Sequence, residues 1–196
     1  MKRFRKILIV LLAILVPVSI GFGFNFFSGE SSDSAENQAM TVEGTLTINQ
    51  ISEAQNLVPG DKICNGVTMD ITSSAVSLLR VKVDIYCADS KTAETDIAPI
   101  KNAGDNWLKG SDGYYYYTQG VKNGDIVKLA EGGIYFNGIN DNVDMNKYQG
   151  EKIKVVANAE LVQAKHGVFA EKWGLSENKD GDIYTKLKKI SNDQGQ

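Results

Sequence analysis

The chain has 196 residues, of which 21 are Lys or Arg, 24 are Asp or Glu and one is His, and its formal net charge is −3. An acidic chain lacks the basic surface on which counterion release drives binding to phosphate backbones, so we expect no nucleic acid partner. The single histidine, His166, argues against the usual zinc proteases, which hold their metal with two histidines of one helix. The length suffices for one domain with a proper hydrophobic core.

An export signal is predicted at the start of the chain. Basic residues at positions 2, 3, 5 and 6 precede an uncharged apolar run over residues 7–24, and a polar segment follows. We therefore expect the rest of the chain, with 17 basic and 24 acidic side chains, to work outside the cytosol. The run of 18 residues is close to the length that spans a bilayer, whereas Gly21 and Gly23 provide a cleavage site after Gly23. Residues 1–27 are a signal peptide or a membrane anchor helix, and both alternatives stay open.

A polar linker and a single β-rich domain are predicted to follow. Residues 28–40 are small, polar and acidic, and they bury too little apolar area to order themselves. From Thr41 the apolar residues alternate with polar ones, which predicts a half-buried strand at the start of a domain over residues 41–175. The alternating segments at residues 63–71 and 81–87 predict either a hairpin or an arch between two sheets.

Two cysteines, Cys64 and Cys87, lie 23 positions apart in a chain that enters a non-reducing space. If their segments pair as a hairpin, one extra residue at Asn65 and Gly66 forms a bulge that brings Cys64 opposite Cys87. We therefore predict a disulfide between them. The alternative is a pair of buried free thiols.

Four consecutive tyrosines at residues 114–117 predict a strand with two rings on each face. Tyr115 and Tyr117 are a candidate binding surface for a glycan or a protein. The alternative is that these rings pack inside the fold and only their hydroxyl groups reach its edge.

The acidic loops invite a calcium interpretation. Residues 137–146 supply the oxygen donors Asp141, Asn142, Asp144 and Asn146. They lack the glycine and the late glutamate that a helix-loop-helix calcium site requires, and residues 178–182 are explained as a turn. We predict no metal and no cofactor, and no nucleophile has a catalytic motif around it.

The last part of the domain is predicted to contain its longest strand, over residues 151–163, in a central position. Phe169 and Trp173 are four residues apart, which places both on one face of a short closing helix. Residues 176–196 are polar and lysine-rich, so we interpret them as a solvated, mobile tail. Together these patterns predict an all-β fold of two stacked antiparallel sheets with small helical additions.

Five short motifs follow the export signal in order: TVEGTL at 41–46, PGDK at 59–62, LRVKV at 79–83, DGYYYY at 112–117 and NKYQG at 146–150. Their order and spacing resemble the TasA and camelysin family of exported Gram-positive proteins over about residues 40–175. The resemblance implies a jelly-roll-like antiparallel β-sandwich, export through a dedicated signal peptidase and, as in TasA, assembly into matrix fibres. Camelysin is described as a metalloprotease, but this sequence offers no zinc-binding residues onto which that activity could be carried.

Three functions are weighed on this basis. The first is a secreted or cell-surface structural protein that polymerises with itself or with other matrix proteins when Phe24, Phe26 and Phe27, released by cleavage, add as a strand to the next subunit. The second is a monomeric surface binding module held by an uncleaved anchor. The third and most remote is a camelysin-like protease.

Overall fold

The computed structural model describes residues 44–48, 52–87, 90–137, 148 and 150–194. The export signal with Phe24, Phe26 and Phe27, the linker and the acidic residues 141–146 lie outside the described residues. The elements are β1 Gly44–Ile48, β2 Ser52–Gln55, β3 Lys62–Cys64, β4 Val67–Ser73, β5 Ser77–Cys87, η1 Thr95–Ile97, β6 Trp107–Lys109, β7 Tyr114–Tyr117, β8 Ile126–Leu129, β9 Ile134–Tyr135, β10 Lys152–Gln163, η3 Lys165–Gly167, α1 Val168–Trp173 and α2 Glu177–Asp193.

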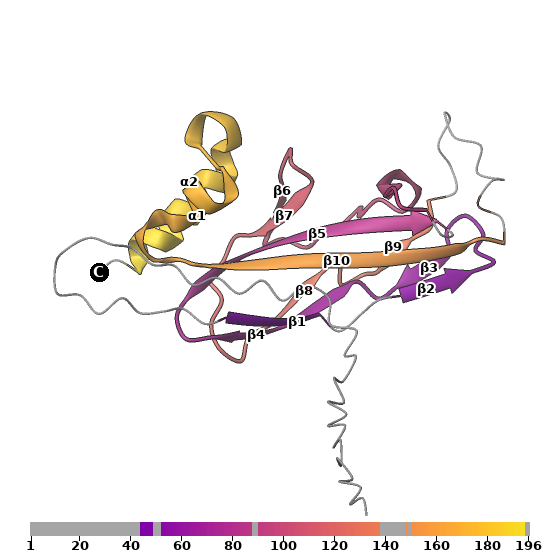
Figure 1. The fold of residues 1–196 in the computed structure, drawn as a ribbon, viewed down its shortest axis with the longest axis horizontal. Helices are drawn as coiled ribbons and strands as arrows, with labels where there is room; N and C mark the ends of the chain where they lie inside the picture. The colour runs from indigo at the N-terminus through magenta and orange to yellow at the C-terminus, as the bar shows by residue number, and fades with distance from the viewer. Residues whose placement is uncertain (1–43, 49–51, 88–89, 138–147, 149, 195–196) are drawn as a thin grey trace, which may run out of the picture.

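The strands form antiparallel sheets, which confirms the prediction of a mainly β fold with few helices. One sheet has the strand order β2-β10-β5-β7-β6, a second has the order β1-β4-β8, and β3 pairs with β9. The strands β5 and β10 pair over eleven residues, from Ile153 opposite Cys87 to Gln163 opposite Ser77, and they run along the molecule (Figure 1). The predicted long, central strand at residues 151–163 is confirmed as β10.

The segments before and after residues 74–76 form an arch rather than a hairpin. The strand β4 pairs with β1 and β8, whereas β5 pairs with β10 and β7 in the other sheet. Of the two alternatives that the sequence left open, the arch is therefore correct. The chain changes sheet here because both β4 and β5 carry apolar residues at every second position and bury them against each other's sheet.

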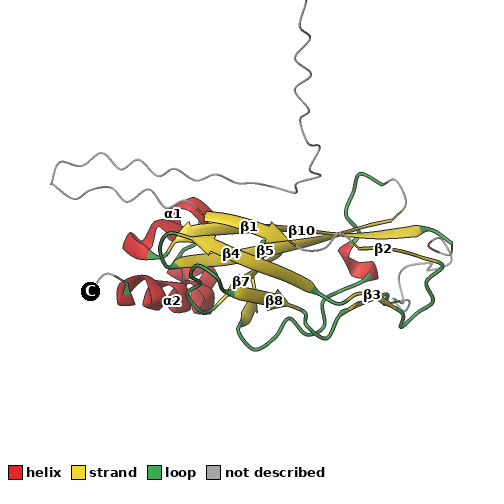
Figure 2. Cartoon of the chain, turned by 90° about the horizontal axis from the view of Figure 1, so that it is seen from below, coloured by secondary structure: helices red, strands yellow, loops and turns green. Residues whose placement is uncertain are grey.

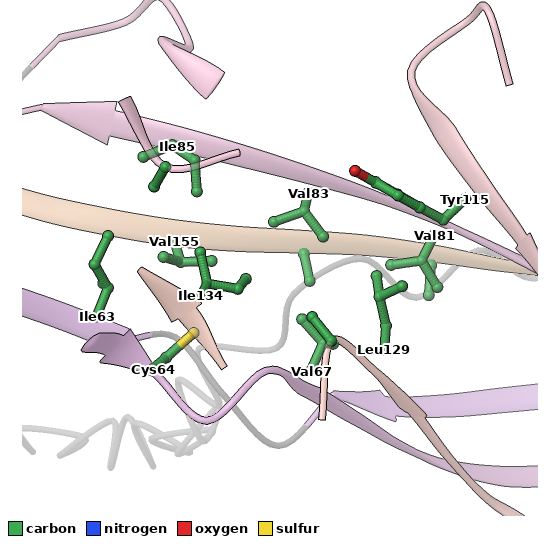
Figure 3. Close-up of a cluster of buried hydrophobic side chains, with 14 of the residues drawn as sticks. Ile63, Cys64, Val67, Val81, Val83, Ile85, Tyr115, Leu129, Ile134 and Val155 are labelled. Carbon is green, nitrogen blue, oxygen red and sulfur yellow. The ribbon is translucent and has the colours of Figure 1, made fainter. Parts of the chain in front are cut away.

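Most buried side chains belong to one group, the inner cluster, which draws on both larger sheets. In β5 and β10 the odd-numbered residues supply it, as expected for side chains that alternate across a strand. Figure 3 shows part of this cluster, and its central members are Val67, Met69, Ile71, Leu79, Val81, Val83, Ile85, Tyr115, Leu129, Ile134, Ile153 and Val155.

A second buried group, the outer cluster, lies on the opposite face of the five-stranded sheet at one end. It joins sheet residues to α1 and α2, and its members are Leu78, Tyr116, Val162, Ala164, Phe169, Trp173, Leu175, Ile183 and Leu187. The predicted closing helix is confirmed as α1, which buries Phe169 and Trp173.

The predicted mobile tail is wrong, because residues 177–193 form α2 and bury Ile183 and Leu187 against the sheet end. The helix was not predicted because its apolar positions recur only every four residues and lie between lysines, among them Lys186, Lys188 and Lys189. Within the described part of the chain, no helix combines the length and the apolar character needed to cross a bilayer.

Candidate functional site

The four tyrosines of β7 are packed on both faces of the sheet. Tyr115 is 6% exposed and lies in the inner cluster, while Tyr117 is half-buried and packs its ring against Trp107 at a centroid distance of 5.0 Å. Tyr116 is 0% exposed and lies in the outer cluster, with half-buried Tyr114 beside it. The predicted binding surface at Tyr115 and Tyr117 therefore does not form, because those rings face the interior between the sheets. The packing alternative is the correct one.

The outer face carries a charged network that the sequence analysis did not find. Arg80 of β5 stands opposite Glu160 of β10 and opposite Tyr116 of β7 in the ladder. Its Nε and Nη2 donate to Glu160 Oε2 at 3.1 and 2.8 Å. Its guanidinium carbon lies 4.0 Å from the ring centroid of Tyr114 and 5.0 Å from that of Trp173. One cation thus joins three strands of the sheet to α1.

The hydroxyl groups of the two tyrosines complete this network. Tyr114 donates to Glu160 Oε1 at 2.9 Å, and Tyr116 donates to Asp112 Oδ2 at 2.6 Å. Burial and the bond to the carboxylate of Asp112 raise the pKa of Tyr116 well above its usual range. Burial alone lowers the pKa of Arg80, but the bonds to Tyr116 and Glu160 outweigh it, so that the net shift is upward. The arginine stays charged and the tyrosines stay protonated at neutral pH.

The network holds α1 on the sheet through Trp173. The side chains of Arg80 and Glu160 are 11% and 16% exposed, so removal of Arg80 would leave Glu160 as a nearly buried charge without a cation, whereas Arg80 also lies 3.8 Å from Asp112 Oδ2. The sequence holds one indication of this network. Side chains alternate along strand 77–87, so Arg80 lies on the same face as the apolar Leu78. An apolar residue on that face indicates that another element covers it.

Both cysteines are buried, and no disulfide joins them. Cys64 pairs with Ile134 across the β3–β9 ladder, and Cys87 stands opposite Ile153, so the hairpin that would have placed them opposite each other does not exist. Figure 3 shows the Cys64 side chain among the aliphatic groups of the inner cluster. Burial raises the pKa of the Cys64 thiol, which therefore stays protonated and reacts slowly. The structure gives the alternative of two buried thiols in place of the predicted disulfide.

Gly66 belongs to the turn between β3 and β4 rather than to a bulge facing β5. Its φ is +88°, and a Cβ atom at this position would lie only 2.2 Å from the carbonyl oxygen of Ala130. Only glycine allows the turn to approach that carbonyl so closely.

A seam lies between the two larger sheets along β1. Among the described residues, β1 has a ladder only with β4, and β2 covers only residues 152–155 of β10. The strands β1 and β10 lie side by side (Figure 2), yet no ladder of described residues joins them. We call β1 together with residues 156–163 of β10 the β1–β10 seam. Strand edges of this kind present backbone donors and acceptors to an added strand.

The opposite edge of the three-stranded sheet is partly covered. The indole Nε1 of Trp107 donates to the carbonyl oxygen of Lys128 in β8 at 2.8 Å. Directly after β8, the backbone N–H of Ala130 donates to the carbonyl oxygen of Ala103 at 3.1 Å. Trp107 and the loop before β6 therefore occupy part of the β8 edge, while β1 is the other edge strand of that sheet among the described residues.

The remaining candidate sites give little support for a function. Among the described residues, no three His, Cys, Asp or Glu side chains group as metal ligands. Residues 178–182, explained from the sequence as a turn, form the first turns of α2, where Asp180 accepts a bond from the backbone N–H of Ser176 at 2.9 Å. An open cleft of about 290 Å³ between α2 and the β6–β7 turn is lined by Lys109, Lys179, Asp180 and Asp182, whose opposite charges favour neither an anion nor a cation. His166 is exposed in η3.

The comparisons with known proteins add no relative. No family model, no curated protein and no solved structure matches the chain.

Proposed function

We propose that the chain is an exported structural protein of the cell surface or extracellular matrix, built on a jelly-roll-like β-sandwich and able to assemble by strand addition. The predicted export signal and the resemblance to the TasA and camelysin family support this proposal. The observation that carries it is the β1–β10 seam, where no ladder of described residues joins two strands that lie side by side, because donor-strand assembly adds a strand at an edge of this kind.

The position of the seam fits this mode of assembly. It is bounded by β1, the first described strand, which begins four residues after the end of the linker. The linker over residues 28–40 can span at most about 47 Å when fully extended, which is enough to reach a neighbouring subunit. The apolar segment that contains Phe24, Phe26 and Phe27 would supply the added strand, and its aromatic side chains suit a half-buried edge.

The experiment begins with the N-terminus of protein recovered from the medium and from the cell surface. Protein that starts at Phe24 is expected to form oligomers whose size rises with concentration, as measured by light scattering. Replacing Phe26 and Phe27 together with Ser should abolish the oligomers, whereas the matched replacement of Ser31 and Ser32 with Ala in the linker should leave them unchanged. Processed protein that stays monomeric at every concentration would refute assembly.

Attachment by an uncleaved segment is the second candidate, because the uncharged run of 18 residues is long for a cleaved signal. In that case the domain is a monomeric surface module that stays at the membrane. Recovery of the intact N-terminus from the membrane fraction would support it.

A further inference from the structure

One end of the molecule carries a concentration of lysine side chains from three separate segments. The segments are the loop between β7 and β8, the turn η3 and the second half of α2. All five side chains are exposed, and they are Lys122, Lys165, Lys186, Lys188 and Lys189. We call this group the basic end.

Backbone and packing contacts bring the three segments together. Val121 bridges to Ser77 at the start of β5, and Ala164 N donates to the carbonyl oxygen of Val76 at 3.0 Å. Gly167 N donates to Ser191 Oγ at 2.8 Å, which joins η3 to α2. Ile190 reaches the β7–β8 loop, because a Cβ atom on Gly120 would lie 3.2 Å from its Cγ2.

Three acidic groups of the described residues lie near these five lysines. Asp182 and Asp193 are exposed on α2, one helical turn before Lys186 and one turn after Lys189. Asp125 is half-buried and uses Oδ2 to accept a bond from the backbone N–H of Lys122 at 2.9 Å. The basic end is therefore positive on a chain whose net charge is negative.

The fold begins at the same end. Gly44 stands opposite Ser73 in the β1–β4 ladder, and Ser73 bonds through its hydroxyl group to Ser77 at 2.9 Å. In Figure 1, α1 and α2 lie at one end of β5 and β10, while β2 and β3 lie toward the other. A chain that arrives from a membrane segment therefore enters the domain beside the lysines. Residues 28–43 span at most about 58 Å when fully extended, which limits how far this end can move from a bilayer that holds the N-terminal segment.

We propose that the basic end is a contact surface for anionic phospholipid headgroups, and that it orients the domain on the membrane. The proposal rests on the proposed export and, for the orientation, on a retained N-terminal segment. Each lysine held close to an anionic leaflet favours the bound state by a factor of about five, and the effect vanishes beyond a Debye length. On α2, Lys186, Lys188 and Lys189 surround the buried Leu187, so they lie on the half of the helix that faces away from the sheet.

The acidic segment before β1 is a competing partner for these lysines, because it carries Glu30, Asp33, Glu36 and Glu43. Exposed ion pairs with such a segment contribute little, and the segment must also be ordered to make them. We therefore assign the surface to lipid headgroups rather than to the linker.

The test is lysine acetylation footprinting of the full chain reconstituted in vesicles. Vesicles of phosphatidylcholine alone are compared with vesicles that also contain phosphatidylglycerol, and flotation shows first whether the chain is attached. Acetylation of the five lysines should slow in the anionic vesicles only, and the protection should disappear at high salt. Lys62, Lys91 and Lys152, exposed toward the opposite end, are the internal control.

Two variants with equal charge change sharpen the result. Combined Lys186→Gln, Lys188→Gln and Lys189→Gln should reduce the ratio of membrane-facing to free domain by roughly a hundredfold, which restores acetylation at Lys122 and Lys165. Combined Lys62→Gln, Lys91→Gln and Lys152→Gln should leave protection at the basic end intact.

Each other outcome overturns the proposal in a distinguishable way. Attached chain that is acetylated uniformly refutes the contact surface while leaving membrane attachment standing. Protection of the basic end that is equal with neutral vesicles points to the acidic linker as the occupant. Protection by a soluble polyphosphate but not by anionic vesicles assigns the surface to a phosphate polymer. Chain that does not float with either vesicle refutes the attachment itself.

Discussion

The two faces of β5 are covered by different means. Leu78 and Leu79 are neighbours in the chain and both are 0% exposed, but Leu79 lies in the inner cluster and Leu78 in the outer one. The inner cluster is almost wholly apolar and joins strands that are far apart in the sequence. The outer cluster joins the sheet to helices that directly follow β10, and it includes the charged network around Arg80. We infer that the inner cluster determines the fold and that the outer cluster holds the helices on a sheet that is already formed.

The largest effect is expected from Leu79→Ala. A cavity among closely packed side chains from both sheets has few ways to collapse, so we expect a loss of about 4 kcal/mol in the free energy of unfolding. Leu78→Ala should cost less, about 2 to 3 kcal/mol, because α1 and α2 can shift to fill the space. Urea unfolding measures both values. Equal losses, with equal amide exchange throughout the molecule, would contradict the division into two clusters.

Arg80→Ala is expected to have the next largest effect. It leaves Glu160 without its partner in a nearly buried site and removes the cation between two rings, so we expect a loss of about 2 to 3 kcal/mol. Arg80→Lys should recover only part of it, because an ammonium group cannot make the paired guanidinium contacts. Lys128→Ala is the control, since its pair with Glu131 is exposed and should make no measurable difference. Near-UV circular dichroism of Trp173 and urea unfolding report the outcome.

Stability is expected to fall in alkaline solution through the outer cluster. The pKa values of Tyr114 and Tyr116 are raised in the folded state, so the stability they contribute is fully present below the unfolded pKa of about 10 and is lost as the pH rises above it. For one such group the loss is at most about 1.4 kcal/mol per pH unit. Tyr116→Phe should flatten this decline, whereas Tyr135→Phe at an exposed site should not. A decline that is the same in all three proteins would refute the assignment to Tyr116.

The smallest effect concerns the thiols of the inner cluster. A thiol reagent should modify Cys64 and Cys87 slowly in the native protein and rapidly in denaturant, with two thiols recovered per chain. Non-reducing peptide mapping is the check. A linked pair of cysteine peptides would show that the arrangement at β3 and β5 differs from the one described.

The sequence predicted the features that depend on local alternation. Residue spacing alone predicts the strand β10, the buried faces of β4 and β5, and the burial of Phe169 and Trp173 by one short helix. Features that depend on which strands become neighbours did not follow. The disulfide prediction assumed that β4 and β5 pair with each other, but each pairs within a different sheet.

The predictions of functional sites were wrong for a related reason. Alternation shows that Tyr115 and Tyr117 share a face, but it does not show which face the other sheet covers. The helix α2 escaped detection because its polar residues outnumber its buried ones, and tertiary packing on Leu78 and Tyr116 stabilises it more than its own composition does. Arg80 was visible only as a charge in an apolar strand, and its partners lie 36 and 80 residues away.

Amide hydrogen exchange along β10, measured by NMR, tests the β1–β10 seam most directly. Residues 152–155 lie between β2 and β5 and serve as the internal control. In residues 156–163 the account predicts that every second amide, bonded to β5, is protected and that the alternate amides exchange as fast as those of loops. Uniform protection of these residues would show that the seam is closed and would contradict assembly at this edge.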